Sequence, residues 1–521
     1  MTTWARTALL YAIFVSLGGF VFGYDASVIA GVVGFVKQEF ALNDYQLGLV
    51  VSAPTFTATL AALTVTPLAD RFGRKNILMM LAFLYLLSAI YSAFAPDYIN
   101  LVIARMIGGY AFGSLMLAPV FIAETSPSDK RGLMVSVNQL NIVVGLSAAY
   151  FVNYFLLNAA DSGEAWASAL YIDSHTWRVM LFIESIPAAL WFLLLFLIPE
   201  SPRWLVKKGR EQQAKSVLHK IVDPARIETS YQRIVDNLQD TQESLKDNLK
   251  GLFASKMRFI LLIGVLLAVV QQATGINAVF FYAPTIFEQS GVGTDAAFIQ
   301  AVYVGLINVV FTVIAMLLID RLGRKPLMVI GLAGVMISLL TTAYGFSKAT
   351  FTLEQEDVLA LSDRHQIPAI YTLTGKKFDS DVTFKEAVIA VIGDDKMRST
   401  ESDIMNRAIT INAQLVLIGI LGFVASFAIS LGPVMWVMLS EIFPNNLRAV
   451  AMAFTGVFNS GTSFLVQFLF PKGLSTFGAA TMFSVYGAFA ILGLLLVIKY
   501  LPETKGKSLE ELEDALVNNR S

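Results

Sequence analysis

The sequence reads Asp70-Arg71-Phe72-Gly73-Arg74-Lys75 between two long apolar stretches, and Asp320-Arg321-Leu322-Gly323-Arg324-Lys325 between two others. The second copy follows the first at an offset of 250 residues, from residue 70 to residue 320. A soluble repeat protein would not place such matches at the borders of apolar stretches. The repeat therefore predicts two related halves, each built of membrane-spanning helices.

Twelve apolar stretches are long enough to cross a bilayer, which takes about 20 residues. In the first half they cover 9-35, 46-69, 76-96, 99-123, 133-157 and 178-199. In the second half they cover 258-286, 298-319, 326-346, 408-440, 448-470 and 477-501. We therefore expect an all-α membrane protein with one six-helix bundle in 1-199, a second in 258-501 and a tail in 502-521.

Composition supports lipid as the solvent of this chain. Hydrophobic residues make up 56% and charged residues 15% of the 521, against about 25% charged in a soluble protein. The net charge of -1 gives no reason to expect a nucleic acid partner. There is no cysteine, and the three histidines (His175, His219 and His365) lie far apart. We expect no disulfide, metal site or cofactor, and no nucleophile–base set suggests an enzyme.

Two segments lie outside the bundles. Residues 200-257 are polar, and Ala214, Val217, Leu218 and Ile221 repeat at helical spacing, which predicts a linker with amphipathic surface helices. Residues 347-407 separate the ninth and tenth spans and are polar as well. They could form a small capping subdomain or a disordered loop, and the sequence leaves both open.

Basic residues set the orientation, because short cytoplasmic loops are rich in Lys and Arg. One set of loops holds Arg6, Arg71, Arg74, Lys75, Lys130, Arg131, Arg321, Arg324, Lys325 and Arg448, and the opposite set holds Lys37 and Lys472. Both termini and 200-257 are therefore expected in the cytoplasm, and 347-407 outside.

Further motifs identify the family that this sequence resembles. They are Gly18-Gly19-Phe20-Val21-Phe22-Gly23-Tyr24-Asp25, Arg105-Met106-Ile107-Gly108-Gly109, Pro199-Glu200-Ser201-Pro202-Arg203, Gln271-Gln272-Ala273-Thr274-Gly275-Ile276-Asn277 and Pro502-Glu503-Thr504-Lys505-Gly506. Together with the duplicated hexapeptide they resemble the sugar porter family of the major facilitator superfamily, and in particular its proton-coupled bacterial pentose and hexose carriers. The resemblance covers nearly the whole chain except 347-407.

The resemblance implies the major facilitator fold, alternating access, and import of a monosaccharide by proton symport. It also implies a multi-pass, monomeric protein of the bacterial inner membrane, with a sugar, a proton and the lipid bilayer as its partners. A facilitative sugar uniporter and a polyol (inositol-like) proton symporter remain alternatives. A non-transporting sugar receptor of this fold would be expected to carry a long cytoplasmic tail.

Carried over residue by residue, the resemblance implies seven sugar contacts: Gln139, Gln271, Gln272, Asn277, Asn308, Trp436 and Asn459. A carboxamide suits a hydroxyl, since both groups donate and accept hydrogen bonds and no charge is buried. The alternative is that these amides join helices to one another inside the membrane. Position 281 is Phe where the family usually has Tyr, which leaves the identity of the sugar open.

Three ionisable residues lie well within the spans: Asp25, Arg105 and Glu184. Charged groups are costly in lipid, so they are functional candidates by default. The resemblance implies that Asp25 carries the proton and Arg105 is its partner. A static ion pair between two helices is the alternative, and Glu184 could be purely structural.

The charged motif residues at the cytoplasmic ends are expected to form a network of ion pairs. By resemblance this network joins the ends of the two bundles and holds the outward-facing state. Its members are Asp70, Arg71, Arg74, Glu124, Arg131, Glu200, Arg203, Asp320, Arg321, Arg324, Glu441, Arg448 and Glu503.

Overall fold

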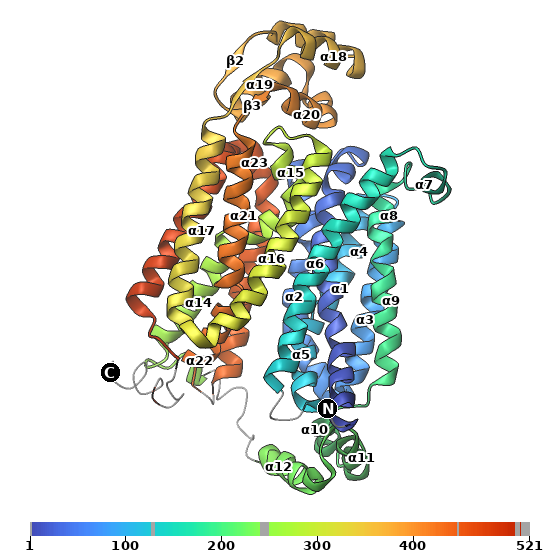
Figure 1. The fold of residues 1–521 in the computed structure, drawn as a ribbon, viewed down its shortest axis with the longest axis vertical. Coiled ribbons are helices and arrows are strands. Elements are labelled where there is room, and N and C mark those ends of the chain that lie inside the picture. Colours follow the sequence, from blue (N-terminus) through green and yellow to red (C-terminus); the bar gives the residue numbers. More distant parts are fainter. Residues whose placement is uncertain (1–2, 127–130, 240–249, 445–446, 506–510, 512–521) are drawn as a thin grey trace.

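The computed structural model describes residues 3–126, 131–239, 250–444, 447–505 and 511. Its helices form two bundles that stand side by side, with α10–α12 at one end and α18–α20 at the other (Figure 1). The two bundles meet near α18–α20 and diverge toward α10–α12. Eleven helical stretches in the described residues are long and apolar enough to cross a membrane.

The first half holds six of these stretches. Its elements are α1 (Thr3–Glu39), α2 (Asp44–Phe72), α3 (Arg74–Ala93), α4 (Tyr98–Ala111), α5 (Ser114–Thr125), α6 (Arg131–Asp161), α7 (Ala165–Ala169), α8 (Thr176–Ile183), α9 (Ser185–Leu194) and η1 (Leu195–Leu197). Two expected spans are interrupted: α4 and α5 together form one, and α8 to η1 form another. The second interruption falls at Glu184, which the sequence placed inside an unbroken span.

The segment between the two bundles carries short helices among its described residues: α10 (Pro202–Lys207), α11 (Glu211–Ile221), η2 (Pro224–Arg226) and α12 (Ile227–Gln239). Ala214, Val217, Leu218 and Ile221 are all buried on one face of α11.

The second half holds α14 (Arg258–Ala273), α15 (Ile276–Glu288), α16 (Thr294–Leu322), α17 (Arg324–Ser347), α21 (Ala413–Ile429), α22 (Pro433–Ile442) and α23 (Arg448–Tyr500). The expected spans 448-470 and 477-501 are joined in one helical stretch, α23, which ends at Tyr500. The loop expected between them is helical up to Gly478, where a φ of 77° interrupts the helix. Glycine adopts a positive φ at little energetic cost, so this single residue takes the place of the expected loop. Twelve spans thus appear as eleven stretches.

Residues 350–410 are folded, which decides between the two alternatives for the segment after the ninth span. They comprise β1 (Thr350–Thr352), α18 (Gln355–His365), η3 (Pro368–Leu373), β2 (Lys377–Phe378), α19 (Asp381–Ile392), α20 (Asp394–Ala408) and β3 (Ile409–Thr410). The strands form an antiparallel sheet in the order β2-β1-β3. Phe351, Leu361, Phe384 and Ile404 pack in a core of its own. We call this unit the cap; the tenth span consequently begins at Ala413 rather than 408.

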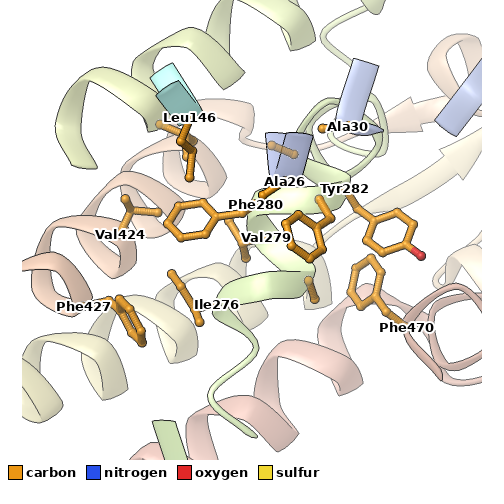
Figure 2. Packing of buried hydrophobic residues seen from close by; sticks show 14 of the residues in the cluster. Ala26, Ala30, Leu146, Ile276, Val279, Phe280, Tyr282, Val424, Phe427 and Phe470 are labelled. Carbon is orange, nitrogen blue, oxygen red and sulfur yellow. The ribbon is translucent and has the colours of Figure 1, made fainter. Parts of the chain in front are cut away.

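The two halves share apolar contacts along α15. Phe280 of α15 lies next to Leu146 of α6 (Figure 2). The hydroxyl of Tyr150, one turn further along α6, donates a hydrogen bond to the Phe280 carbonyl. Helices α6 and α16 also pack closely, because a Cβ on Gly305 would lie 2.8 Å from the Cα of Ser147. These contacts hold the outer parts of the halves together.

Candidate sugar and proton sites

A break in the seventh span brings two amides together. Helix α14 ends at Ala273 and α15 begins at Ile276, with Gly275 between them at a φ of 85°. A side chain at that position would collide with the ring of Tyr486, 2.4 Å from an added Cβ. The turn lets Asn277 Nδ2 donate to Gln272 Oε1 at 2.9 Å.

Asn459 of α23 completes a cluster with these amides. Its Nδ2 donates to Gln271 Oε1 at 2.6 Å and to the Ala268 carbonyl at 3.0 Å, and its Oδ1 accepts from Gln272 Nε2 at 3.2 Å. Gln271 Nε2 donates to the Leu431 carbonyl at 2.7 Å. Leu431 lies in the gap between α21 and α22, so the break in the tenth span supplies an acceptor. We call Gln271, Gln272, Asn277 and Asn459 the amide cluster.

The cluster continues through side chains that the sequence analysis did not single out. Asn277 Nδ2 also donates to Ser463 Oγ at 2.7 Å, and Gln467 Nε2 donates to the same oxygen at 2.7 Å. Thr55 of α2 donates to Gln467 Oε1 at 3.0 Å, which links the chain of hydrogen bonds to the first half. Asn459, Ser463 and Gln467 are spaced four residues apart on one face of a helix, and that spacing was a signal available in the sequence.

The other three predicted sugar contacts lie elsewhere. Gln139 is on α6, Asn308 is on the facing helix α16, and Trp436 is on α22. Asn308 is buried, and the other two are half-buried. Within the described part of the chain no hydrogen bond joins them to the amide cluster. Their role as sugar contacts therefore stays a prediction.

Asp25 and Arg105 form a buried ion pair in the first half. Arg105 Nη1 donates to Asp25 Oδ1, and both side chains are 2% exposed. Glu184, at the interruption between α8 and α9, is equally buried and lies close enough to Asp25 and Arg105 to interact with their charges. The second oxygen of Asp25 and the Nε of Arg105 have no hydrogen-bond partner among the described residues. The structure therefore brings all three predicted ionisable residues together.

The duplicated hexapeptide has the same local structure in both halves. Gly73 and Gly323 have φ values of 105° and 95° and separate two helices. The carboxylates of Glu200 and Glu503 then accept hydrogen bonds from the first backbone N–H groups of α3 and α17. A carboxylate at a helix N-terminus is favourable, so each half-closing motif caps the helix that follows its hexapeptide.

Among the described residues, the ion pairs formed by the predicted cytoplasmic network join residues of the same half. Arg74 contacts Asp70 at 2.7 Å and Glu124 at 3.3 Å, and Arg324 contacts Glu441 at 3.0 Å. Arg448 donates to the Phe443 carbonyl at 3.4 Å, Arg321 offers its carbonyl to Lys505, and Arg71 stacks on Phe72. Arg203 is exposed. The side chains of Arg131 and Asp320 lie outside the described residues. Pairing between the halves therefore stays a prediction for the outward-facing state.

Comparison with known proteins gives the family. The family described as "Sugar (and other) transporter" matches residues 11–361 and 390–516. The chain belongs to the sugar transporter family. The stretch that this match leaves out, 362–389, lies inside the cap.

Relatives of this sugar transporter cover almost its whole length. The "Arabinose-proton symporter" of Bacillus subtilis (strain 168) is 36% identical over 95% of this chain and 92% of the relative. The "D-xylose-proton symporter" of Escherichia coli (strain K12) is 32% identical over 96% and 93%. Two structures of the xylose transporter XylE from E. coli, one inward open and one partially occluded inward open, superpose with a TM-score of 0.73 at 30% identity. They cover 97% of this chain and 99% or 100% of XylE. The chain thus has the twelve-helix major facilitator fold of a multi-pass membrane protein.

Proposed function

We propose that this protein imports a monosaccharide, a hexose or a pentose, by proton symport with alternating access. The amide cluster carries the proposal: it offers uncharged donors and acceptors, buried where two helices of the second half are broken. Broken helices near the midplane are where transporters of this kind bind substrate. The hydroxyl groups of a sugar both donate and accept hydrogen bonds, so they can pair with these amides in place of water.

Proton coupling is proposed on two grounds. Two relatives are named proton symporters, and this chain has a carboxylate, Asp25, buried against Arg105 within the spans. A carboxylate in that setting can change its protonation when the halves move, because burial and the arginine act on it in opposite directions. We further propose that the protein acts as a monomer in the bacterial inner membrane. No enzymatic activity, cofactor or nucleic acid partner forms part of this proposal.

Uptake into proteoliposomes tests this function. The purified protein should accumulate at least one labelled monosaccharide from a panel of pentoses, hexoses and polyols when the outside is more acidic. Dissipating the pH gradient should abolish accumulation and leave equilibration. Equilibration without any gain from the gradient would identify a uniporter, and uptake of polyols alone would identify the polyol alternative. Absence of any uptake would contradict the proposal.

A further inference from the structure

The cap contacts both halves of the transporter. It is inserted between α17 and α21 of the second half. Its helix α20 carries Glu401, whose Oε2 accepts a hydrogen bond from Lys37 Nζ at 2.6 Å. Lys37 belongs to α1 in the first half. The other oxygen of Glu401 lies 2.8 Å from the Nζ of Lys385, on α19 of the cap. One carboxylate therefore ties the first half to the cap.

The cap is also fixed to its own half. Asp381, at the start of α19, accepts a hydrogen bond of 3.4 Å from the backbone N–H of Ala479. A Cβ at the adjacent Gly478 would lie 2.5 Å from Asp381 Oδ1, so α23 approaches the start of α19 closely at this point. The strands β1 and β3 pair at the base of the cap, between the ends of α17 and α21. The cap should therefore move with the second half as one body.

This arrangement belongs to the state in which the outer side is closed. Thr55 bonds to Gln467 across the halves, and Ser475 Oγ donates to Asp44 Oδ2 at 2.5 Å. Both contacts lie on the side of the cap. Opening toward the outside by rocking the halves apart must draw α1 away from α20. The bond between Lys37 and Glu401 cannot survive that movement.

The ion pairs of Glu401 with Lys37 and Lys385 are shielded from solvent, so each contributes more free energy than an exposed surface pair. Lys385 is 7% exposed, and the side chains of Lys37 and Glu401 are 20% and 25% exposed. Removing one partner from a shielded pair leaves a charge without compensation. A cavity of about 110 Å³ lined by Lys37, Asp44, Glu288 and Glu401 adjoins them, so water can solvate both charges once they part.

We propose that Lys37, Glu401 and Lys385 form an outer latch, which holds the inward-facing state closed on the outside and must open in every transport cycle. The proposal rests on the proposed transport function. Lys385 positions Glu401 within the cap, and Lys37 separates from Glu401 when the outer side opens. Weakening the latch should shift the population toward the outward-facing state.

A labelling experiment tests the latch without measuring transport. The chain has no cysteine, so a single introduced thiol gives the whole signal. Ser52 is fully buried on α2, four residues beyond Gly48, whose Cα faces the Phe468 carbonyl of the second half. In Ser52→Cys protein, Glu401→Gln should raise the rate of reaction with an impermeant thiol reagent added outside by about fivefold or more. An unchanged rate would overturn the proposal.

Asp403→Asn is the matched control. Asp403 also lies on α20 and also loses ion pairs, but its partners His365, Arg364 and Arg407 all belong to the cap. Labelling of Ser52→Cys should be unaffected by this change. An equal increase in both variants would show that damage to the cap, and not the latch, opens the outer side, and would likewise reject the proposal.

A reversible cross-link tests the latch in the transport cycle. A cleavable bifunctional thiol reagent joining Lys37→Cys to Glu401→Cys should stop sugar uptake, and reduction should restore it. The control pair, Asp357→Cys with Arg407→Cys, replaces an ion pair within the cap and should transport equally well before and after cross-linking. Full uptake by the cross-linked test pair would refute the latch. Absence of uptake by the wild type would instead count against the proposed function.

Discussion

Each amide of the cluster is held by another amide or by a backbone carbonyl. Gln272 is central, since it donates to Gln271 and Asn459 and accepts from Asn277. Such cross-bonding fixes the orientation of side chains that would otherwise sample many rotamers. A sugar bound at this proposed site would meet donors and acceptors already in place, which reduces the entropy cost of binding.

Gln272→Ala should weaken sugar binding while the protein still folds. The change removes a proposed sugar partner and leaves Asn277 and Asn459 each without one hydrogen bond. We expect a loss of about 1–3 kcal/mol, seen as a higher KM for uptake. Gln232→Ala, on the exposed face of α12, is the control and should leave KM unchanged. If Gln272→Ala leaves the KM of every transported sugar as it was, the cluster is not the binding site.

At the level of single residues, the sequence identified the kinds of side chain but not their pairing. Gln271, Gln272 and Asn277 stand in one motif, yet only the left-handed turn at Gly275 brings the last of them back to the first two. The sequence did not predict that Ser463 and Gln467 belong to this hydrogen-bonded chain, because polar residues within a span can equally well join helices. The grouping of Asp25, Arg105 and Glu184 was predictable, because charges in lipid need partners.

The secondary-structure elements show where a pattern is informative and where it is not. Two spans are broken at glycine or proline, at Gly275 and at Gly432-Pro433. Pro54 and Pro67, however, lie inside the unbroken helix α2, so residue type alone does not place a break. The loop expected before residue 477 does not exist, because one glycine turns the chain and hydropathy cannot distinguish a polar helix end from a loop. The cap was undecided for a related reason: its core is small, and a few scattered apolar residues are compatible with disorder as well.

Removing the cap should leave a folded transporter. Thr350 and Thr410 are paired residues of β1 and β3, so the two chains entering the cap run about 5 Å apart. A short linker from Phe346 to Ala408 can therefore replace 347-407 without straining α17 or α21. Size-exclusion profile and thermal unfolding should resemble those of the full chain, while a thiol at position 52 should label faster because the latch is gone. Aggregation of the shortened protein would show that the cap is needed for folding.

Lys385→Met should make the latch sensitive to pH. Burial by itself would raise the pKa of Glu401, but the charges of Lys385 and Lys37 hold that pKa well below its usual range. Asp44, Asp381 and Glu288 also face this group of charges. Because the pKa of Glu401 is depressed, its carboxylate stabilises the latch at every pH above the ordinary glutamate pKa. This stabilisation is lost only as the pH falls through the depressed pKa. Without Lys385 the pKa rises, and the loss moves to higher pH.

The labelling rate of Ser52→Cys between pH 7 and pH 5 measures this difference. Its ratio to the rate for Ser347→Cys, at the exposed outer end of α17, removes the pH dependence of the reagent. The ratio should stay flat in the otherwise wild-type protein and rise toward pH 5 with Lys385→Met. A flat ratio in both proteins would mean that Lys385 does not set the charge of Glu401.

Across the whole molecule, the coupling of proton to sugar must act over a distance within the fold. Asp25 and Arg105 belong to the first half, whereas the amide cluster belongs to the second. They are connected by the contacts between halves, such as Thr55 with Gln467 and Tyr150 with Phe280. A proton on Asp25 would weaken its bond to Arg105 and so change how easily the halves move. Coupling then requires no direct contact between the proton and the sugar. It requires only that both shift the same equilibrium between the inward-facing and outward-facing states.

Asp25→Asn tests this mechanism, because it fixes the neutral form of the side chain. In proteoliposomes with an acidic outside, the variant should fail to accumulate sugar against its gradient. Exchange of labelled for unlabelled sugar at equal concentrations should persist, since the amide cluster is untouched and the halves can still move with sugar bound. Measuring both quantities on the same preparation separates coupling from binding. Loss of exchange as well would indicate that the ion pair holds the first half together, and continued accumulation would place the proton elsewhere, with Glu184 the first residue to replace.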